Sequence, residues 1–387
     1  MKTYIKNYCI GCGACQSLNH ADLKKNEKGY LYPVNEKIDW LEKVCPASGL
    51  HVSLMSKDSW GRKKAVYYGW SSNEQIRKSA SSGGVLTELA SFMLEYKLVD
   101  AVLHTCVNNQ KPWETQICYS TTKEQVVERC GSRYSISHPL AELHKLNPEK
   151  KYLFIGKPCD VIALRNLQKI EPKWQEIIPY TFSFFCAGLP SVDAQKKLLN
   201  SLGTNEKSCV ALRYRGNGWP GYATAVDQKG KSYQMDYNTS WGTILGRDIM
   251  KACRFCLDGI GEMADISCGD AWYLTPEGKP DFRENKGRNI VFARTEKGYE
   301  LLQKVKKSGN LVLQETNEKE ARLSQIQKYQ YERKATMVAK ILAVRMAFHP
   351  TPKYSLRMLM KWSRDVSLRK QWQIFKGTLK RVIQGKI

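Results

Sequence analysis

Short apolar runs alternate with amphipathic stretches through the middle of the chain. The runs have the length and the β-branched or aromatic content of buried strands, and they lie at 99–106, 152–155 and 177–186. In other stretches apolar residues recur every three or four positions, as in an amphipathic helix, at 85–96, 161–168 and 192–202. The alternation predicts an α/β fold with a mixed sheet covered by helices.

The segment 209–237 follows a different pattern. Two strand-like stretches flank the turn-forming sequence Val226-Asp227-Gln228-Lys229-Gly230-Lys231. We therefore expect an antiparallel portion beside the mixed sheet. With a cysteine-bearing start and a helical end, the pattern divides the chain into an N-terminal module at 1–58, an α/β body at 59–330 and a tail at 331–387.

The tail carries an amphipathic pattern with a strong positive charge. Its apolar residues recur at intervals of three or four and are Leu359, Trp362, Val366, Leu368, Trp372, Phe375, Leu379 and Val382. Residues 333–387 contain 14 Lys or Arg and one acid, Asp365. The net charge of this segment, 14 − 1 = +13, is more than half of the +24 of the whole chain. The stripe is typical of a helix that lies on an anionic membrane, but it would serve equally to pack the tail on the body.

Charge and hydropathy limit the class of protein. The N-terminus has no apolar stretch before Cys9, and no run reaches the roughly 18 to 20 apolar residues of a membrane span. These features predict a cytoplasmic protein with at most peripheral membrane contact. The basic charge could also attract nucleic acid, but the body lacks the interleaving of basic and aromatic residues, so we expect no specific nucleic-acid partner.

Thirteen cysteines in a reducing compartment indicate metal or redox sites rather than disulfides. Cys9, Cys12 and Cys15 form a C-x2-C-x2-C run, and a Cys-Pro pair at Cys45 follows. This is the ligand pattern of one ferredoxin 4Fe-4S cluster. A structural zinc site is the alternative, although zinc is usually held by two separated C-x2-C pairs. The module has four such cysteines and so predicts one cluster.

Further cysteines and several glycine-rich motifs recur along the body. The motifs are Ser79-Ala80-Ser81-Ser82-Gly83-Gly84-Val85-Leu86-Thr87, Gly131-Ser132-Arg133-Tyr134, Gly156-Lys157-Pro158-Cys159-Asp160, Phe185-Cys186-Ala187-Gly188, Arg215-Gly216-Asn217-Gly218-Trp219, Cys253-Arg254-Phe255-Cys256 and 264–272. In this order, after a ferredoxin-like module, they resemble the coenzyme F420 hydrogenase/dehydrogenase beta-subunit family. The basic tail and short module look more like the bacterial members that accompany polysaccharide synthesis than like the archaeal hydrogenase type.

The resemblance implies FAD in the body and a second 4Fe-4S cluster, giving two clusters in all. The implied ligands of the second cluster are Cys159, Cys186, Cys253 and Cys256. The other cysteines lack metal-ligand spacing and are expected to be free thiols, namely Cys106, Cys118, Cys130, Cys209 and Cys268.

The residue types of two motifs suit a flavin independently of the family. The Ser81–Gly84 segment and Thr87 stand at the start of an expected helix, where amides and hydroxyls could bind phosphate or merely cap the helix. Gly131 and Ser132 precede a cation and an aromatic ring, Arg133 and Tyr134, which suit phosphate pairing and ring stacking. Many relatives have lysine in place of Arg133. Lys157 could stabilise a reduced flavin or be a solvated loop lysine.

These expectations describe an iron-sulfur flavoprotein oxidoreductase. Clusters transfer single electrons and flavins can deliver two together, so the set would convert between one-electron carriers and two-electron chemistry. The implied partners are a redox protein such as ferredoxin or a reductase subunit, and a small-molecule substrate such as a deazaflavin or a polysaccharide-pathway intermediate. The alternative is an electron-transfer subunit that relays electrons to a partner enzyme and has no substrate of its own.

Overall fold

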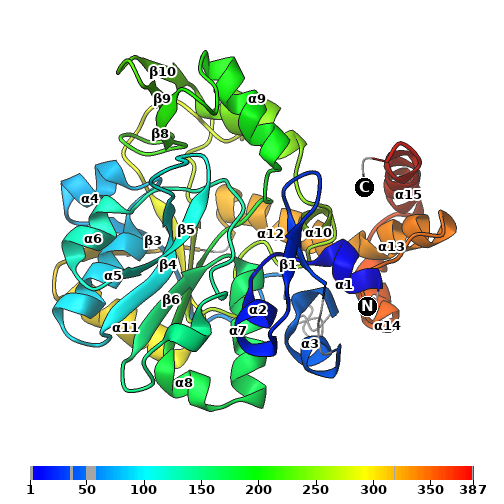
Figure 1. Ribbon diagram of the computed structural model, residues 1–387, viewed down its shortest axis with the longest axis horizontal. Coiled ribbons are helices and arrows are strands. Elements are labelled where there is room, and N and C mark those ends of the chain that lie inside the picture. The colour runs from blue at the N-terminus through cyan, green and yellow to red at the C-terminus, as the bar shows by residue number, and fades with distance from the viewer. Residues whose placement is uncertain (1–2, 35–37, 49–57, 318, 386) are drawn as a thin grey trace.

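The computed structural model describes residues 3–34, 38–48, 58–317, 319–385 and 387. Its main feature is an eight-stranded sheet in the order β13-β3-β12-β11-β7-β6-β4-β5 (Figure 1). The strands are β3 (Ala65–Ser71), β4 (Ala101–Val107), β5 (Thr115–Ser120), β6 (Tyr152–Gly156), β7 (Tyr180–Phe184), β11 (Ile266–Asp270), β12 (Asn289–Ala293) and β13 (Leu311–Glu315). The strand-like runs of the sequence became β4, β6 and β7.

The sheet is mixed, as its sequence pattern predicts. β4, β6, β7 and β11 are neighbours that run parallel, and the remaining pairings are antiparallel. The loops after the parallel strands therefore leave the sheet at one edge. Two of the motif cysteines, Cys159 and Cys186, follow β6 and β7 at that edge.

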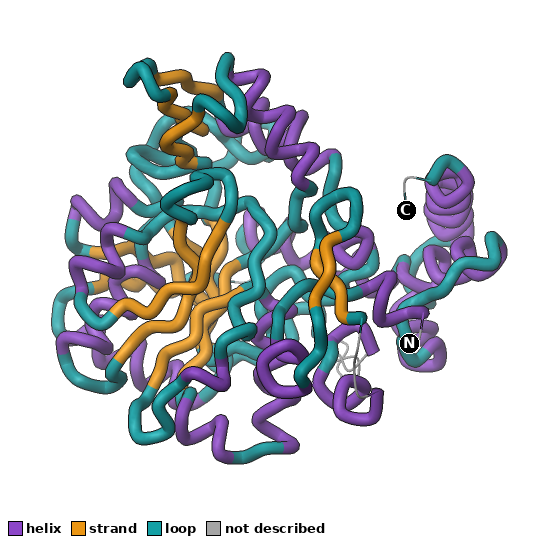
Figure 2. Tube along the Cα trace, in the orientation of Figure 1, coloured by secondary structure: helices purple, strands orange, loops and turns teal. Residues whose placement is uncertain are grey.

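Helices bury both faces of this sheet. Val102 and Leu153 pack into one core cluster with residues of α5 (Val85–Glu95) and α11 (Glu296–Lys307). The adjacent residues Leu103 and Phe154 pack into another cluster with α7 (Pro158–Ile170). Neighbouring residues of a strand point to opposite faces, so the two clusters lie on opposite sides of the sheet. Figure 2 shows the strands enclosed between helices.

A small antiparallel sheet stands apart from the main one (Figure 1). It contains β8 (Cys209–Arg213), β9 (Ala223–Asp227) and β10 (Ser232–Met235), in the order β10-β9-β8. β9 and β10 flank the turn at 228–231, which confirms the antiparallel portion that the sequence predicts. α9 (Val192–Leu202) and the π-helix Asn238–Ile244 pack on this sheet.

The remaining elements are short or lie towards the ends of the chain. Near the N-terminus are α1 (Thr3–Tyr8), α2 (Ala14–Asn19), β1 (Leu23–Lys25), β2 (Leu31–Pro33), α3 (Ile38–Val44) and the 3-10 turn Pro46–Ser48. The body adds α4 (Glu74–Ser79), α6 (Lys123–Glu128), α8 (Lys173–Ile177), α10 (Lys251–Arg254) and the 3-10 turns Leu143–Lys145 and Leu245–Arg247. The last helices are α12 (Ala321–Ala335), α13 (Met337–Met346), α14 (Leu356–Ser363) and α15 (Leu368–Ile383).

One core cluster joins the two ends of the chain. It contains Tyr8 and Cys45 from the N-terminal segment, Phe255 from the body, and Met337 and Trp362 from the tail. Figure 1 shows α1 beside α13 and α14. The division at 1–58, 59–330 and 331–387 stays a prediction, and the tail packs on the rest of the molecule through α13 and α14.

One pair of cysteines departs from the expectation of free thiols. Cys106 and Cys118 form a disulfide between β4 and β5. His104 is the residue opposite Cys118 in the strand pairing, so the two cysteines are diagonal neighbours that the pairing brings together. Sequence spacing alone does not reveal such a contact. Cys130, Cys209 and Cys268 are free.

No helix in the described part of the chain combines the length and the apolar character that crossing a bilayer requires.

Candidate functional site

Four cysteines of the N-terminal segment surround one small cavity. Cys9, Cys12 and Cys15 come from the loop before α2 and its first turn, Cys45 follows α3, and all four line the cavity with apolar neighbours such as Leu41. Burial raises the pKa of the Cys12 thiol well above its ordinary value, and the charges of Cys15 and Cys45 raise it further. Burial also raises the pKa of Cys45 to about 12. A set of thiolates at this position therefore requires a bound positive charge.

Two glycines shape the loop that carries the first three cysteines. Gly11 and Gly13 have φ values of 70° and 87°, in the left-handed region that side chains disfavour. A Cβ atom on Gly13 would lie 2.7 Å from the Cβ of Ala141. The Gly11 N–H donates a hydrogen bond to the Cys9 sulfur at 3.3 Å. The loop thus turns a backbone donor towards a thiol.

The four cysteines of the body also come together. Cys159 lies in the first turn of α7, Cys186 follows β7, and Cys253 and Cys256 lie in and after α10. Burial is the main cause that raises the pKa of each thiol, and the charge of Cys186 raises the pKa of the other three. The Leu189 N–H donates to the Cys253 sulfur at 3.3 Å.

Two cations adjoin this second thiol set. Lys157 and Arg333 both lower the pKa of Cys186, opposing the larger effect of burial. Arg333 reaches the set from α12 and donates to the carbonyl oxygens of Cys186 and Cys256 at 3.5 Å. Lys157 is 7% exposed, which excludes a solvated loop lysine. The cations offset negative charge where thiolates would concentrate it.

A buried ion pair lies between the two thiol sets. The Lys157 ammonium contacts the Asp160 carboxylate at 2.7 Å and donates to the Ser137 hydroxyl, also at 2.7 Å. The charge of Asp160 raises the pKa of Cys12 in one set and of Cys159 in the other. The two sets are therefore electrostatic neighbours.

In the described part of the chain, no three His, Cys, Asp or Glu side chains gather as the ligands of one metal ion do. Cys9, Cys12, Cys15 and Cys45 line one cavity. In a 4Fe-4S cluster each thiolate binds a different iron, so the four ligands stand around the cluster.

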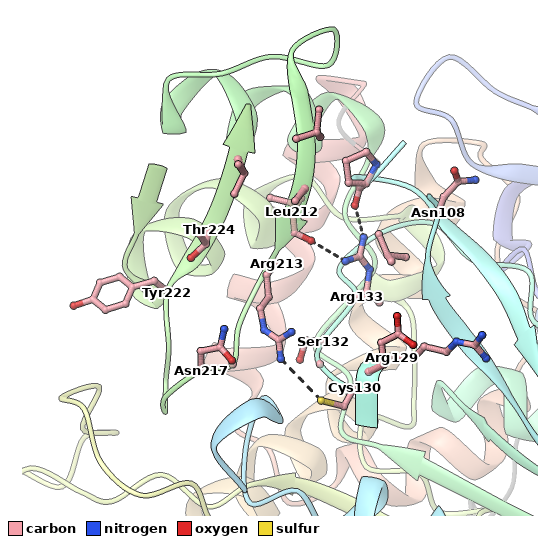
Figure 3. A pocket seen from close by; sticks show the side chains of 18 of the residues that line it. Asn108, Arg129, Cys130, Ser132, Arg133, Leu212, Arg213, Asn217, Tyr222 and Thr224 are labelled. Atoms are coloured by element: carbon pink, nitrogen blue, oxygen red, sulfur yellow. Dashed lines mark hydrogen bonds between the residues drawn. The ribbon is translucent and has the colours of Figure 1, made fainter. Parts of the chain in front are cut away.

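A larger cavity of about 440 Å³ lies between the edge of the main sheet and the small sheet (Figure 3). Its wall includes Gly131, Ser132 and Arg133 from the loop after α6, and Arg213 and Asn217 from the end of β8 and the loop beyond it. Its volume is typical of small-molecule and cofactor sites.

Arginines supply the positive charge of this cavity. Arg133 donates to the carbonyl oxygens of Leu212, at 3.0 Å, and of Pro112, and Arg213 donates to the carbonyl oxygen of Ser79. The Nε atoms of both arginines are buried and have no hydrogen-bond partner among the described residues. The two guanidinium groups place positive charge in the wall of the cavity, which favours an anionic ligand.

The residues that the sequence assigns to a cofactor divide between three places. Gly131, Ser132 and Arg133 line the large cavity, and Ser81 touches them because the Ser132 N–H donates to its hydroxyl at 2.6 Å. The residues after Ser81 contact other parts of the protein and not the cavity. The Val85 N–H donates to the Asn289 side chain at 3.3 Å.

Close packing explains why these residues face inward. The Ser82 hydroxyl donates to the carbonyl oxygen of Arg288, and a Cβ on Gly83 would lie 2.6 Å from the carbonyl oxygen of Gly69. Gly84 is buried, with a φ of 78°, and Thr87 stands in the first turn of α5. These positions serve the packing of α5 on the sheet.

Tyr134 and Lys157 lie away from the cavity wall. Tyr134 packs against Tyr214 and Trp241 under the small sheet, with ring centroids 5.5 and 4.6 Å away. Lys157 adjoins the second thiol set, as described above. The sequence predicted a cofactor role for both residues but not the residues that surround them.

Sequence reasoning missed several charged residues of these sites. Arg213 and Arg333 were given no role, and Arg215 was noted only as part of a motif. Arg215 is 3% exposed, forms two hydrogen bonds with the Asp270 carboxylate at 2.9 and 3.1 Å, and lies over the ring of Trp272. Each contact joins residues far apart in the sequence, and the only local signal was an arginine at a strand end.

Comparisons with known proteins place these features in a family. Residues 66–145 match the profile for the N-terminal part of the coenzyme F420 hydrogenase/dehydrogenase beta subunit, and residues 149–319 match the profile for its C-terminal part. The chain is 25% identical over 299 residues to the coenzyme F420 hydrogenase subunit beta of Methanococcus voltae, covering 76% of this chain and 99% of that protein. It is 25% identical over 252 residues to the F420-dependent formate dehydrogenase subunit beta of Methanocaldococcus jannaschii, covering 63% and 60%.

A solved structure has the same fold. It is the xenon-derivatised F420-reducing [NiFe] hydrogenase complex from Methanosarcina barkeri, one chain of which superposes with a TM-score of 0.56 at 21% identity. The match covers 72% of this chain and 91% of that one. Together with the two profile matches, which span most of the body, this likeness leads to one assignment. The chain belongs to the coenzyme F420 hydrogenase/dehydrogenase beta-subunit family.

Proposed function

We propose that the protein is an electron-transfer oxidoreductase subunit that holds two 4Fe-4S clusters on its two cysteine sets and FAD in its large cavity. The observation that carries this proposal is the pair of four-cysteine sets, which adjoin one buried ion pair. The relatives support a redox role, because those named above are hydrogenase and formate dehydrogenase subunits.

Cluster binding explains the thiol sets better than zinc binding does. Zinc is usually held by two separated C-x2-C pairs, whereas Cys9, Cys12 and Cys15 form a C-x2-C-x2-C run that a distant Cys-Pro at Cys45 completes. These four cysteines surround one cavity. Around the other set, Lys157 and Arg333 supply the positive charge that an anionic cluster would need.

The large cavity suits the phosphate end of a flavin dinucleotide. Gly131, with a φ of 115°, presents backbone without a side chain, Ser132 adds a hydroxyl, and Arg133 and Arg213 add positive charge. Backbone, hydroxyl and guanidinium donors are the groups that bind pyrophosphate. When bound, the clusters would supply one-electron transfer and the flavin two-electron chemistry.

The second substrate is a small acceptor or donor, such as a deazaflavin or a polysaccharide-pathway intermediate. A relay subunit without a substrate of its own is the other candidate, favoured because the relatives are named as subunits and the structural match is a complex. Reduction of added coenzyme F420 or another small acceptor by the isolated, dithionite-reduced protein would favour the first. Reduction of a partner enzyme alone would favour the second.

Anaerobic purification tests the cofactors. We expect about eight irons and eight sulfides per chain, from two four-thiolate sites, and FAD released on denaturation. Cys12→Ser should lower iron to about half and leave most of the flavin bound, whereas Cys256→Ser should lower iron to about half and also loosen the flavin. Cys209→Ser is the control, since its hydroxyl can keep the bond of that buried thiol to the Ala211 carbonyl.

Two outcomes would overturn the proposal. Stoichiometric zinc without broad visible absorption in the anaerobic protein would exclude the clusters. Arg213→Gln provides the second test, because it removes a charge that faces the large cavity. Unchanged flavin content in a folded Arg213→Gln protein would place the flavin elsewhere.

A further inference from the structure

The last helix, α15, leaves an apolar stripe uncovered. Along one side, Thr378 and Val382 are buried where the helix packs against α13. On the neighbouring side Leu368, Trp372 and Ile383 are 87%, 55% and 74% exposed. The stripe that the sequence predicts in the tail is therefore divided. Leu359 and Trp362 of α14 are buried, whereas the α15 part faces outward.

The exposed stripe is narrow and continuous. With 3.6 residues per turn, Leu368, Leu379, Trp372 and Ile383 fall within about 60° of the helix circumference. Leu379 is half-buried and fills the middle of the stripe. The Trp372 ring stacks on Phe375, with centroids 5.2 Å apart, so the tryptophan is held in place at the surface.

A row of basic residues borders this stripe. Arg369, Lys376 and Lys380 follow on the next roughly 40° of the helix and are exposed. No described carboxylate pairs with them, whereas Lys370, on the other side, is bound to Glu332 at 2.5 Å. The Lys376 ammonium lies 5.1 Å from the centre of the Trp372 ring, at the boundary of the two strips.

The stripe lies outside the region that defines the family. The two matched segments end at residue 319, before α15 begins. Seven of the fifteen large exposed apolar side chains of the described residues fall within 337–387, a segment that also holds much of the net positive charge. Exposed apolar area and positive charge thus coincide in a part that the relatives' shared fold does not require.

We propose that this face of α15 docks the protein onto an anionic membrane surface, with Leu368, Trp372 and Ile383 entering the interface and Arg369, Lys376 and Lys380 against the lipid phosphates. An apolar strip with tryptophan beside a basic strip is what an interfacial helix needs. A second copy of the same face would bring like charges together, which disfavours self-association through it. The helix lies on the membrane and does not span it, because its other side packs on α13.

The test is flotation of the full-length, anaerobically purified protein with vesicles of equal parts phosphatidylglycerol and phosphatidylcholine, at about 0.1 M salt. We expect the protein to float with these vesicles and not with pure phosphatidylcholine. Leu368→Gln/Trp372→Gln should weaken binding by more than about tenfold. Arg369→Gln/Lys376→Gln/Lys380→Gln should weaken it on the order of a hundredfold, at about fivefold for each base.

Two control variants separate this face from general effects. Gln373→Ala/Gln384→Ala changes two exposed neutral residues that lie beyond the basic row, the second at the C-terminal cap of α15, and Lys197→Gln/Lys306→Gln/Lys307→Gln removes three exposed lysines of α9 and α11. Both should bind as the unaltered protein does. All variants should keep the same thermal unfolding midpoint, because none of the changed side chains is buried.

Three results would overturn the proposal. The first is the absence of flotation with anionic vesicles. The second is a loss of vesicle binding in the Lys197/Lys306/Lys307 control as large as that in the Arg369/Lys376/Lys380 variant, which would show that net charge alone attracts the protein. The third is self-association or capture of an acidic protein that depends on Leu368 and Trp372 without any vesicle binding, which would assign the face to a protein partner.

Discussion

At the scale of single residues, charged side chains are buried only where the fold provides partners. Glu262 and Lys334 are 2% and 1% exposed and lie 2.6 Å apart. The pKa of Glu262 is raised to about 7, mainly by burial and also by the charge of Asp258, and Lys334 only partly opposes these effects. The unfavourable desolvation of the Glu262 carboxylate is therefore larger than its favourable electrostatic interaction with Lys334.

This balance predicts a pH dependence of stability. Because the folded-state pKa of Glu262 exceeds its unfolded value, the folded chain binds more protons between about pH 4.5 and 7, and stability from this group falls as pH rises through that window. The free energy of unfolding of Glu262→Gln should lack that part of the decline. Urea denaturation at several pH values measures it, with the exposed Glu300→Gln as control. Parallel pH profiles for the unaltered protein and Glu262→Gln would contradict the assignment.

At the scale of elements, local pattern was a reliable guide to structure. The helices predicted at 85–96 and 192–202 are α5 (Val85–Glu95) and α9 (Val192–Leu202). The cysteine loop is similarly local, because its glycines take the positive φ values that its curvature needs. The residues that an element packs against come from distant parts of the sequence. Gly13 combines a local requirement, its positive φ, with a distant one, its contact with Ala141.

Gly13 should be intolerant of a side chain for two separable reasons. Gly13→Ala places a methyl group in an unfavourable φ and against Ala141, at 2.7 Å. Gly230 has a similar φ of 77° and nothing within 4 Å of its Cβ position. We expect Gly230→Ala to cost about 1 kcal/mol and Gly13→Ala about 2 to 5 kcal/mol, by urea denaturation.

The substitution at Gly13 should also lower the iron content, because Gly13 lies in the N-terminal cysteine loop. In the anaerobic protein, Gly13→Ala should lower iron towards half and Gly230→Ala should not. Equal effects of the two substitutions would show that backbone strain alone, and not contact with Ala141, accounts for the loss.

At the scale of the whole molecule, the two chain ends and the second thiol set share one core. Trp362 of α14 is 3% exposed in the cluster that also contains Cys15, Cys45 and Phe255. Trp372 of α15, ten residues later, is 55% exposed. Removing the whole tail would open this core, so point substitutions are the better probes of the tail.

The two tryptophans provide a matched pair. Trp362→Ala should lower the free energy of unfolding by about 3 to 5 kcal/mol, because it leaves a cavity in the shared core. Trp372→Ala should change it by less than about 0.5 kcal/mol, because that ring packs mainly at the surface. A large loss from Trp372→Ala would mean that the α15 stripe is covered by the rest of the protein.

The sequence by itself determined whatever depends on near neighbours. Spacing of three, glycine positions and hydrophobic period specified the Cys9–Cys15 loop, the strands β4, β6 and β7, and the tail helices, because these follow from backbone geometry within a few residues. Only the tertiary structure decided which residues from distant segments meet. It buried Lys157 against Ser137, brought Arg213 to the large cavity and Arg333 to the second thiol set, joined Cys106 to Cys118, and covered Trp362 while leaving Trp372 exposed. Such contacts result from strand order and helix packing across the whole chain, and a local pattern carries no record of them.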